Sequence, residues 1–293
     1  MFAIIGMVIV IGAVVGGYLM EKGNLLVLLQ PAELVIIGGA AIGTLLVANP
    51  LPIVIKIFTG MLSVIGGSKY SKAYYLNTLK MLLDLFNYAR KAGMAKLEGD
   101  IEDPTKSDVL KKYPDFLKDH HAVHFLCDTI RTSLSGIVAP FELDQMMELD
   151  MEVHHQDAHV PVAALTTVAD ALPGLGIVAA VLGVVITMGS LGGPPEEIGH
   201  KVAAALVGTF LGILLCYGFF APLAANMTNI INAEAQYYST LRVALIGFAK
   251  GVAPVIAVEF ARRAIPHACR PSFKEFEAAS KGGAAAAPDS KAA

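Results

Sequence analysis

The sequence predicts an all-α integral membrane protein with four transmembrane helices, a large helical cytoplasmic loop and a C-terminal cytoplasmic segment. Three observations predict this class. Apolar residues make up 55% of the chain and charged residues only 16%, and the mean hydropathy is +0.60, which is unusual for a soluble globular protein. Four charge-free stretches approach or exceed the roughly 20 apolar residues that cross a bilayer core. Lys and Arg gather outside these stretches. The net charge of −3 gives no reason to expect a nucleic-acid partner.

The first two expected spans lie near the N-terminus. Residues 2–20 carry no charge, and no Lys or Arg precedes their apolar run, so we do not interpret them as a signal peptide. A second charge-free run covers residues 34–55. Because Pro50 and Pro52 cannot continue a helix without strain, we expect this span to end near Asn49.

The third and fourth spans are expected at residues 171–195 and 202–233. Neither range holds an Asp, Glu, Lys, Arg or His, and the charged residues of this region lie in the segment 196–201 between them. The fourth would be about 48 Å long as a helix, against a bilayer core of about 30 Å, so we expect it to continue into water. Pro222 cannot donate to the carbonyl of Gly218, and its ring clashes there. We therefore expect a kink that faces protein or a wet cavity.

The distribution of basic residues predicts the orientation. Most of the 22 Lys and Arg residues lie between residues 51 and 165 or after residue 233, whereas only Lys22 and Lys201 fall in the two short loops. Positive charge stays inside, so both termini and the long loop are expected in the cytoplasm. The expected organisation is two spans in 1–50, a cytoplasmic helical domain in 51–169, two spans in 170–233, a cytoplasmic helical segment in 234–280 and a disordered tail in 281–293.

The cytoplasmic part has the spacing of helices rather than strands. Apolar residues recur at helical intervals from Tyr75 to Phe86, and Gly93 and Asp103-Pro104 are expected to interrupt the chain afterwards. A second helical stretch is expected over about residues 120–160, with a break at Gly136 or Pro140. Residues 244–258, which contain Lys250 and Pro254, are too short to span and are expected to form a helix at the membrane surface or in the cytoplasm.

Small residues form a ridge on each of the last two spans. They are Pro173, Gly176, Ala180, Gly183 and Thr187 on the third span, and Ala204, Gly208, Gly212 and Cys216 on the fourth. Such ridges let membrane helices approach closely, so ordinary helix packing is one interpretation. The prolines at 173 and 222 favour the other, which is a site that moves or is wetted.

The interiors of the four expected spans lack a proton carrier, because they hold no acid, base or histidine. Intramembrane ionisable groups are the usual relay for protons, so any carboxylate for ion conduction would have to come from a partner. Thr187 and Thr209 offer hydroxyl groups, although a threonine in a membrane helix often bonds back to its own backbone.

Histidines are the only hint of a metal site. His155 and His159 stand one helical turn apart, which suits a ligand pair, but the sequence does not supply a second pair. We interpret them as surface histidines and expect no metal and no cofactor. The common nucleotide-binding and hydrolase motifs are absent from the sequence, so we do not expect an enzyme.

Two motifs in the last two spans identify a family. Residues 205–212 read Ala-Leu-Val-Gly-Thr-Phe-Leu-Gly and are followed by Pro222, while Leu172-Pro173 precedes Gly-Ile-Val-Ala-Ala-Val at 176–181. This pattern resembles the signature of the MotA/TolQ/ExbB superfamily, and the chain as a whole is similar to its flagellar motor stator proteins. Shorter fragments that also fit are residues 16–20, 30–37, 68–70, 113–114, 254–260 and 270–273.

The resemblance implies an assembly in the bacterial inner membrane. Five copies of the chain would surround two copies of a MotB-type partner, which would bring an intramembrane aspartate and a peptidoglycan-anchoring domain. Protons would be the coupling ion, and the cytoplasmic face of the ring would act on the flagellar rotor switch protein. This division of labour agrees with the missing carboxylate.

The resemblance also implies roles for single residues. The proton pathway maps onto Pro173, Ala180, Thr209 and Pro222. The rotor contact maps onto Arg90, Glu98 and Asp150, where Asp150 replaces a longer family acid. Sodium-driven relatives carry threonine at the position of Ala180; because alanine has no oxygen to offer a hard cation, protons are favoured. Two alternatives stay open, a TolQ/ExbB-like energiser of an envelope protein and a structural membrane scaffold.

Overall fold

The computed structural model describes residues 2–189 and 192–281, and every regular element within these ranges is helical. The chain divides into two compact units. The first unit comprises Met1–Gly67 and Asp157–Ile231, and the second comprises Ser68–Gln156 and Asn232–Ala293. Four stretches of the described chain are long and apolar enough to cross a membrane: Phe2–Met20, Leu25–Ala48, Pro140–Met188 and Pro195–Ala249. The prediction of an all-α protein with four spans is therefore confirmed.

The N-terminal part of the first unit contains α1 (Phe2–Met20), α2 (Leu25–Leu28), α3 (Pro31–Ala48) and α4 (Leu51–Gly66). The Asn24 side chain accepts a hydrogen bond from the backbone of Leu26 and caps α2. As predicted, the second span ends at Asn49, which is the C-cap of α3. The expected cytoplasmic domain began at residue 51, whereas the structure groups α4 and residues 157–169 with the membrane spans.

The last two spans are parts of much longer helices. The third belongs to α9 (Pro140–Met188), which contains Pro161 and Pro173 in an otherwise continuous run. The fourth consists of α10 (Pro195–Leu215), a π-helical turn η2 (Cys216–Phe220) and α11 (Ala221–Ala249). The π turn ends two residues before Pro222. The Ala221 amide donates to the Cys216 carbonyl, and this wider hydrogen-bonded turn accommodates the donor that Pro222 lacks.

Two apolar clusters hold the first unit together. One combines Ile57 and Val64 of α4 with Leu165 of α9 and Met227 of α11. The other combines Ile37 of α3 with apolar residues of the third and fourth spans. α1 contributes no buried residue, so its apolar surface is left for lipid or for another chain.

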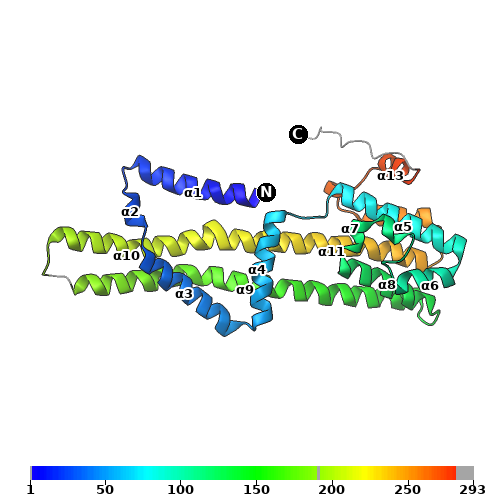
Figure 1. Ribbon diagram of the computed structural model, residues 1–293, viewed down its shortest axis with the longest axis horizontal. Helices are drawn as coiled ribbons and strands as arrows, with labels where there is room; N and C mark the ends of the chain where they lie inside the picture. Colours follow the sequence, from blue (N-terminus) through cyan, green and yellow to red (C-terminus); the bar gives the residue numbers. More distant parts are fainter. Residues whose placement is uncertain (1, 190–191, 282–293) are drawn as a thin grey trace. The chain divides into compact units, whose positions relative to one another are not determined.

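The second unit has its own core. It contains α5 (Lys72–Ala92), α6 (Met94–Glu102), η1 (Leu110–Lys112), α7 (Pro114–Leu117), α8 (His120–Leu134), α12 (Pro254–Ala264), η3 (His267–Cys269) and α13 (Phe273–Ser280). In Figure 1, α5, α6 and α8 gather around the part of α11 that belongs to this unit. The buried face of α5 carries Tyr75, Leu79, Leu82 and Phe86, which confirms the helix predicted from their spacing.

The predicted interruptions of the second unit are confirmed. Gly93 adopts a φ of 89° between α5 and α6, and Gly136 adopts a φ of 68° between α8 and α9. The region 244–258 differs from the prediction of one separate helix. Its first residues finish α11, the chain turns at Gly251 with a φ of 72°, and α12 starts at Pro254. The expected disordered tail lies outside the described residues except for Lys281.

Candidate functional site

The small residues of the last two spans bring the backbones of α9 and α10 into direct contact. A Cβ atom added to Gly176 would lie 2.7 Å from the Gly208 carbonyl oxygen and 3.1 Å from the Cα of Gly212. A Cβ on Gly212 would lie 2.5 Å from the Leu172 carbonyl oxygen. The two contacts with carbonyl oxygens are closer than real Cβ atoms tolerate, so only glycine fits at these positions. The predicted packing of the two ridges is confirmed, and Figure 1 shows α9 and α10 running side by side.

Two predicted pathway residues lie at this contact. The backbone nitrogen of Ala180 would be 3.2 Å from a Cβ on Gly208, and the Cα of Thr209 would be 3.3 Å from a Cβ on Gly176. Ala180 and Thr209 are both partly buried. The other threonine that we singled out, Thr187, donates to the Gly183 carbonyl at 2.8 Å, so its hydroxyl bonds back to its own helix.

The two prolines belong to different surroundings. Pro173 is partly buried in α9, one turn before Gly176. Pro222 lines a pocket of about 210 Å³ between α1 and the π turn, together with Ala3, Val10 and Tyr217. We expected the helix break at Pro222 to face protein or a wet cavity, and the structure places an open pocket beside it.

A buried acid at the start of α3 was missed by the sequence analysis. Glu33 lies in the first turn of α3 and is only 7% exposed. One of its carboxylate oxygens has no hydrogen-bond partner among the described residues and would lie 2.6 Å from a Cβ on Gly208. The second span therefore does carry an acid, in the first turn of α3, where the sequence analysis expected none inside the spans. The available signal was an isolated acid two residues after Pro31.

The predicted rotor residues of α5 and α6 are exposed. Arg90 lies in the last turn of α5 and Glu98 lies in the middle of α6, and Gly93 separates the two helices. The two side chains are therefore carried by separate helices whose relative direction depends on one glycine.

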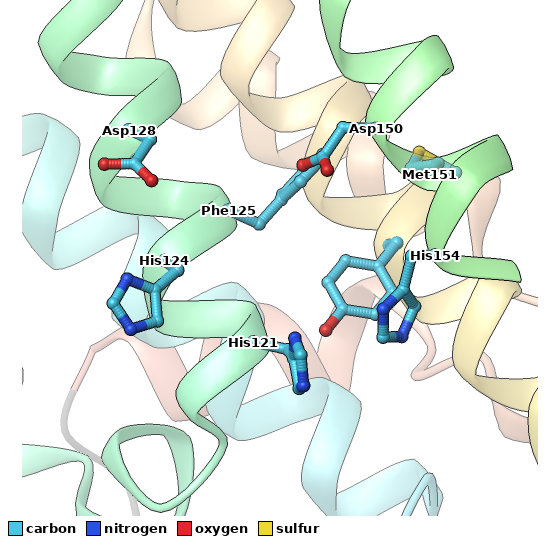
Figure 2. Close-up of a pocket in the computed structure, with 8 residues that line it drawn as sticks. His121, His124, Phe125, Asp128, Asp150, Met151 and His154 are labelled. Carbon is cyan, nitrogen blue, oxygen red and sulfur yellow. The ribbon is translucent and has the colours of Figure 1, made fainter. Parts of the chain in front are cut away.

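Asp150 stands in a different environment, in a pocket of about 160 Å³ in the second unit (Figure 2). The pocket is lined by His121, His124, Phe125, Asp128, Asp150, Met151, His154 and Tyr238. The rings of His121 and His154 lie 4.8 Å apart. Sequence spacing did not bring these histidines together, because α8 and α9 meet only in the folded chain.

His154 also belongs to a chain of polar contacts that joins α9 and α11 to the segment before α5. Its Nε2 atom lies 3.7 Å from a carboxylate oxygen of Glu234, and Tyr70 donates to Glu234 at 3.2 Å. Interaction with Glu234 raises the pKa of His154 from its usual value. Burial opposes ionisation of Glu234, but His154 and the charge of Lys69 hold the pKa of Glu234 below its usual value.

A metal site is not supported by the geometry of the described residues. Within 2–189 and 192–281, no three His, Cys, Asp or Glu side chains converge as metal ligands would. His155 and His159, the pair considered above, are partly buried in α9.

Two protein families match different parts of the chain. Residues 4–93 match the family described as Motility protein A N-terminal, and residues 118–240 match the MotA/TolQ/ExbB proton channel family. The chain is 42% identical to Motility protein A of Escherichia coli over 277 residues, which cover 94% of each protein. It is 33% identical to the chemotaxis protein LafT of Vibrio parahaemolyticus, over 93% of this chain and 96% of LafT.

Two solved structures share the fold. A chain in the structure of C. jejuni MotAB superimposes with a TM-score of 0.75 at 19% identity, covering 92% of this chain and 98% of that one. A chain in the flagellar MotAB stator complex of Bacillus subtilis gives a TM-score of 0.71 at 22% identity, over 88% and 92%.

Proposed function

Because the chain belongs to the MotA/TolQ/ExbB proton channel family, we propose that it is a stator subunit of the bacterial flagellar motor, in which proton flow is converted into torque on the rotor. It is a multi-pass protein of the bacterial inner membrane. The observation that carries this function is the match of residues 4–93 to the Motility protein A N-terminal family, since the relatives over nearly the whole chain are motility and chemotaxis proteins. No enzymatic role is part of the proposal.

The chain works in an assembly with a MotB-type partner. Five copies surround two copies of the partner, whose single span supplies the intramembrane aspartate and whose outer domain is anchored to peptidoglycan. The small-residue contact between α9 and α10 supports this arrangement, because it holds the two spans together while neither helix places an acid in it. The carboxylate beside Gly208 is that of Glu33, at the start of α3. Both termini and the second unit lie in the cytoplasm, as the distribution of basic residues indicates.

The proton pathway runs along the third and fourth spans. Pro173, Ala180, Thr209 and Pro222 border the partner's aspartate. Support comes from the close contact at Ala180 and Thr209 and from the π turn and pocket at Pro222. A backbone that departs from the α-helix inside a membrane is tolerated where it lines a cavity or is buried in protein.

The rotor contact is made by Arg90 and Glu98 on the cytoplasmic unit. Both side chains are exposed, Arg90 in the last turn of α5 and Glu98 in the middle of α6, and this exposure supports the role. Exposed charges steer and register partners more than they add affinity, and salt screens them over about 8 Å at physiological ionic strength. Asp150 is the third residue of this proposed contact, and it is exposed where it lines its pocket.

Ala180 favours protons over sodium as the coupling ion, because its methyl group supplies no ligand for a hard cation. We therefore expect the rotation speed of tethered cells to follow the proton gradient and to be unchanged when external sodium is replaced by potassium. A loss of torque in sodium-free medium at a constant proton gradient would contradict this prediction.

The alternative is a TolQ/ExbB-like energiser that transmits the proton gradient to an envelope protein. The match to the MotA/TolQ/ExbB proton channel family alone is compatible with either role. The four candidate spans and the exposed Arg90 and Glu98 favour the motor.

A strain deleted for this gene tests the motor function. We expect flagellated but paralysed cells, restored by the wild-type gene and impaired by Pro173→Ala or Arg90→Glu. Normal swimming of the deleted strain, with no second copy of the gene present, would favour the energiser. A neighbouring gene for a one-span protein with an intramembrane Asp and a peptidoglycan-binding domain is expected in the first case.

A further inference from the structure

A pocket of about 190 Å³ in the second unit lies between α5 and the segment formed by η1 and α7. The first half of α5 forms one wall, and residues 112–116 form the other. None of the roles discussed above uses this α5–α7 pocket. Polar side chains that line it include Tyr74, Asn77, Lys80, Lys112, Tyr113 and Asp115.

Two lysines from opposite walls reach the α5–α7 pocket. Lys80 is partly buried on α5, and Lys112 is exposed at the end of η1. Within the part of the chain that the structure describes, neither ammonium group has an ion-pair or hydrogen-bond partner. Because removing a charge from water without a counter-charge is unfavourable, an anion bound between the two lysines would stabilise both.

The acids nearest in sequence to these lysines are engaged elsewhere. Asp84 follows Lys80 by one helical turn, a spacing at which the two could pair. Instead it accepts a hydrogen bond of 2.6 Å from the Tyr113 hydroxyl. Asp115 lines the pocket itself and pairs with Lys118 at 3.1 Å. The two lysines of the pocket are therefore an excess of positive charge rather than one half of an ion-pair network.

The remaining polar groups of the walls favour an anion as well. The hydroxyl of Tyr113 donates to Asp84, and that of Tyr74 donates to Asp119 at 3.4 Å, so both are committed to carboxylates. The side-chain amide of Asn77, one turn before the lysine of α5, has no partner in the described ranges 2–189 and 192–281. The pocket thus offers a ligand two ammonium groups and one amide against a single, already paired carboxylate.

We propose that the α5–α7 pocket binds a phosphate-bearing anion that carries two or more negative charges. Lysine binds phosphate as a point charge, so Lys80 and Lys112 hold the anion from opposite walls, and the Asn77 amide donates to a phosphate oxygen. The rings of Tyr74 and Tyr113 give a group attached to the phosphate a flat surface to pack on. This inference does not depend on the motor function.

The test measures binding of pyrophosphate to the full-length protein in phosphatidylcholine nanodiscs by isothermal titration calorimetry. We expect saturable binding that weakens as salt is added, because salt screens the lysine charges. The double variant Lys80→Gln with Lys112→Gln should bind roughly tenfold more weakly or less, since it loses both charge-assisted contacts. Pyrophosphate should also raise the melting temperature of the wild-type protein but not that of this variant.

Lys91→Gln with Lys111→Gln is the matched control. It removes the same charge from the same two elements, at exposed positions outside the pocket, and should keep the wild-type affinity. Equal weakening in both double variants would mean that pyrophosphate responds only to net charge, which overturns the proposal. Absence of saturable binding to the wild-type protein also overturns it. Melting curves without ligand check that both variants fold.

Two further nanodisc compositions distinguish the possible sources of the phosphate group. Phosphatidic acid is added to one preparation, and phosphatidylserine is added to the other as the charged control. Loss of pyrophosphate binding with phosphatidic acid alone supports the proposal and assigns the pocket to a lipid headgroup. Equal binding in both preparations supports it and assigns the pocket to a soluble phosphorylated molecule.

Discussion

Single glycines decide how closely the last two spans approach. Gly176→Ala would place a methyl group 2.7 Å from the Gly208 carbonyl oxygen, and overpacking of this kind costs about 1–3 kcal/mol. We expect the variant to lose most of its swimming speed in soft agar while the protein is still inserted. Gly174→Ala is the control on the same helix, because nothing lies within 4 Å of its added Cβ; it should swim normally. Equal swimming of both variants would show that this contact is dispensable.

His154 links the stability of the second unit to pH. Its pKa is raised in the folded chain by Glu234, so its stabilising effect is complete below the unfolded pKa of about 6.5 and is lost as the pH rises through the folded value. The groups facing it are Glu234 and Tyr238 of α11, His121 of α8, and Asp150 on its own helix, with Asp119 and Lys69 nearby.

We therefore expect the melting temperature of the purified complex to fall as the pH is raised from about 6.5, with a smaller fall in His154→Asn. The comparison between the two proteins isolates this histidine from other groups that titrate in the same range. An identical pH dependence in both would rule out a role for the pair. His124→Asn is a suitable control, because His124 lines the same pocket without contacting Glu234 in any described interaction.

At the level of helices, the turn between α5 and α6 fixes how Arg90 and Glu98 are presented. Gly93 has a φ of 89° and a ψ of 159°, a backbone conformation open essentially to glycine alone, and forcing another residue into it costs about 1–3 kcal/mol. We expect Gly93→Ala to lower the thermal stability of the second unit and to reduce torque, measured on tethered cells.

Gly99→Ala provides a control with the opposite sign. Gly99 is exposed inside α6, nothing lies within 4 Å of its added Cβ, and replacing a helical glycine with alanine stabilises by roughly 0.5–1 kcal/mol. If Gly93→Ala were as stable as Gly99→Ala, the positive φ at Gly93 would not be a constraint.

The helices differed in how far the sequence could predict them. The charge-free runs predicted the number of spans, and two prolines predicted the end of the second span. Glycines predicted the breaks at Gly93 and Gly136. All three signals act locally along the chain. The π turn before Pro222 did not follow, since a proline can also be met by a simple kink. Nor did the burial of Glu33 or the meeting of His121 with His154, because both depend on contacts between helices distant in sequence.

At the level of the whole molecule, the two units are held by separate apolar clusters. Leu126 of α8 is fully buried in the second unit, and Leu→Ala at such a site costs about 2–5 kcal/mol. We expect Leu126→Ala to increase amide hydrogen exchange in residues 68–156 and 232–281 while the α9–α10 contact near Gly176 keeps its protection. Loss of protection in both regions at once would show that the units unfold as one.

The π turn at Cys216–Phe220 should also be visible in alignments of related sequences. A π-helical turn amounts to one extra residue inserted into an α-helix. Relatives whose fourth span is a regular α-helix should therefore align with this chain through a single-residue gap near residues 216–220. Deleting one residue there would turn every later residue of α11 by about 100°, so selection is expected to retain or lose the insertion only together with compensating changes on the faces of α11.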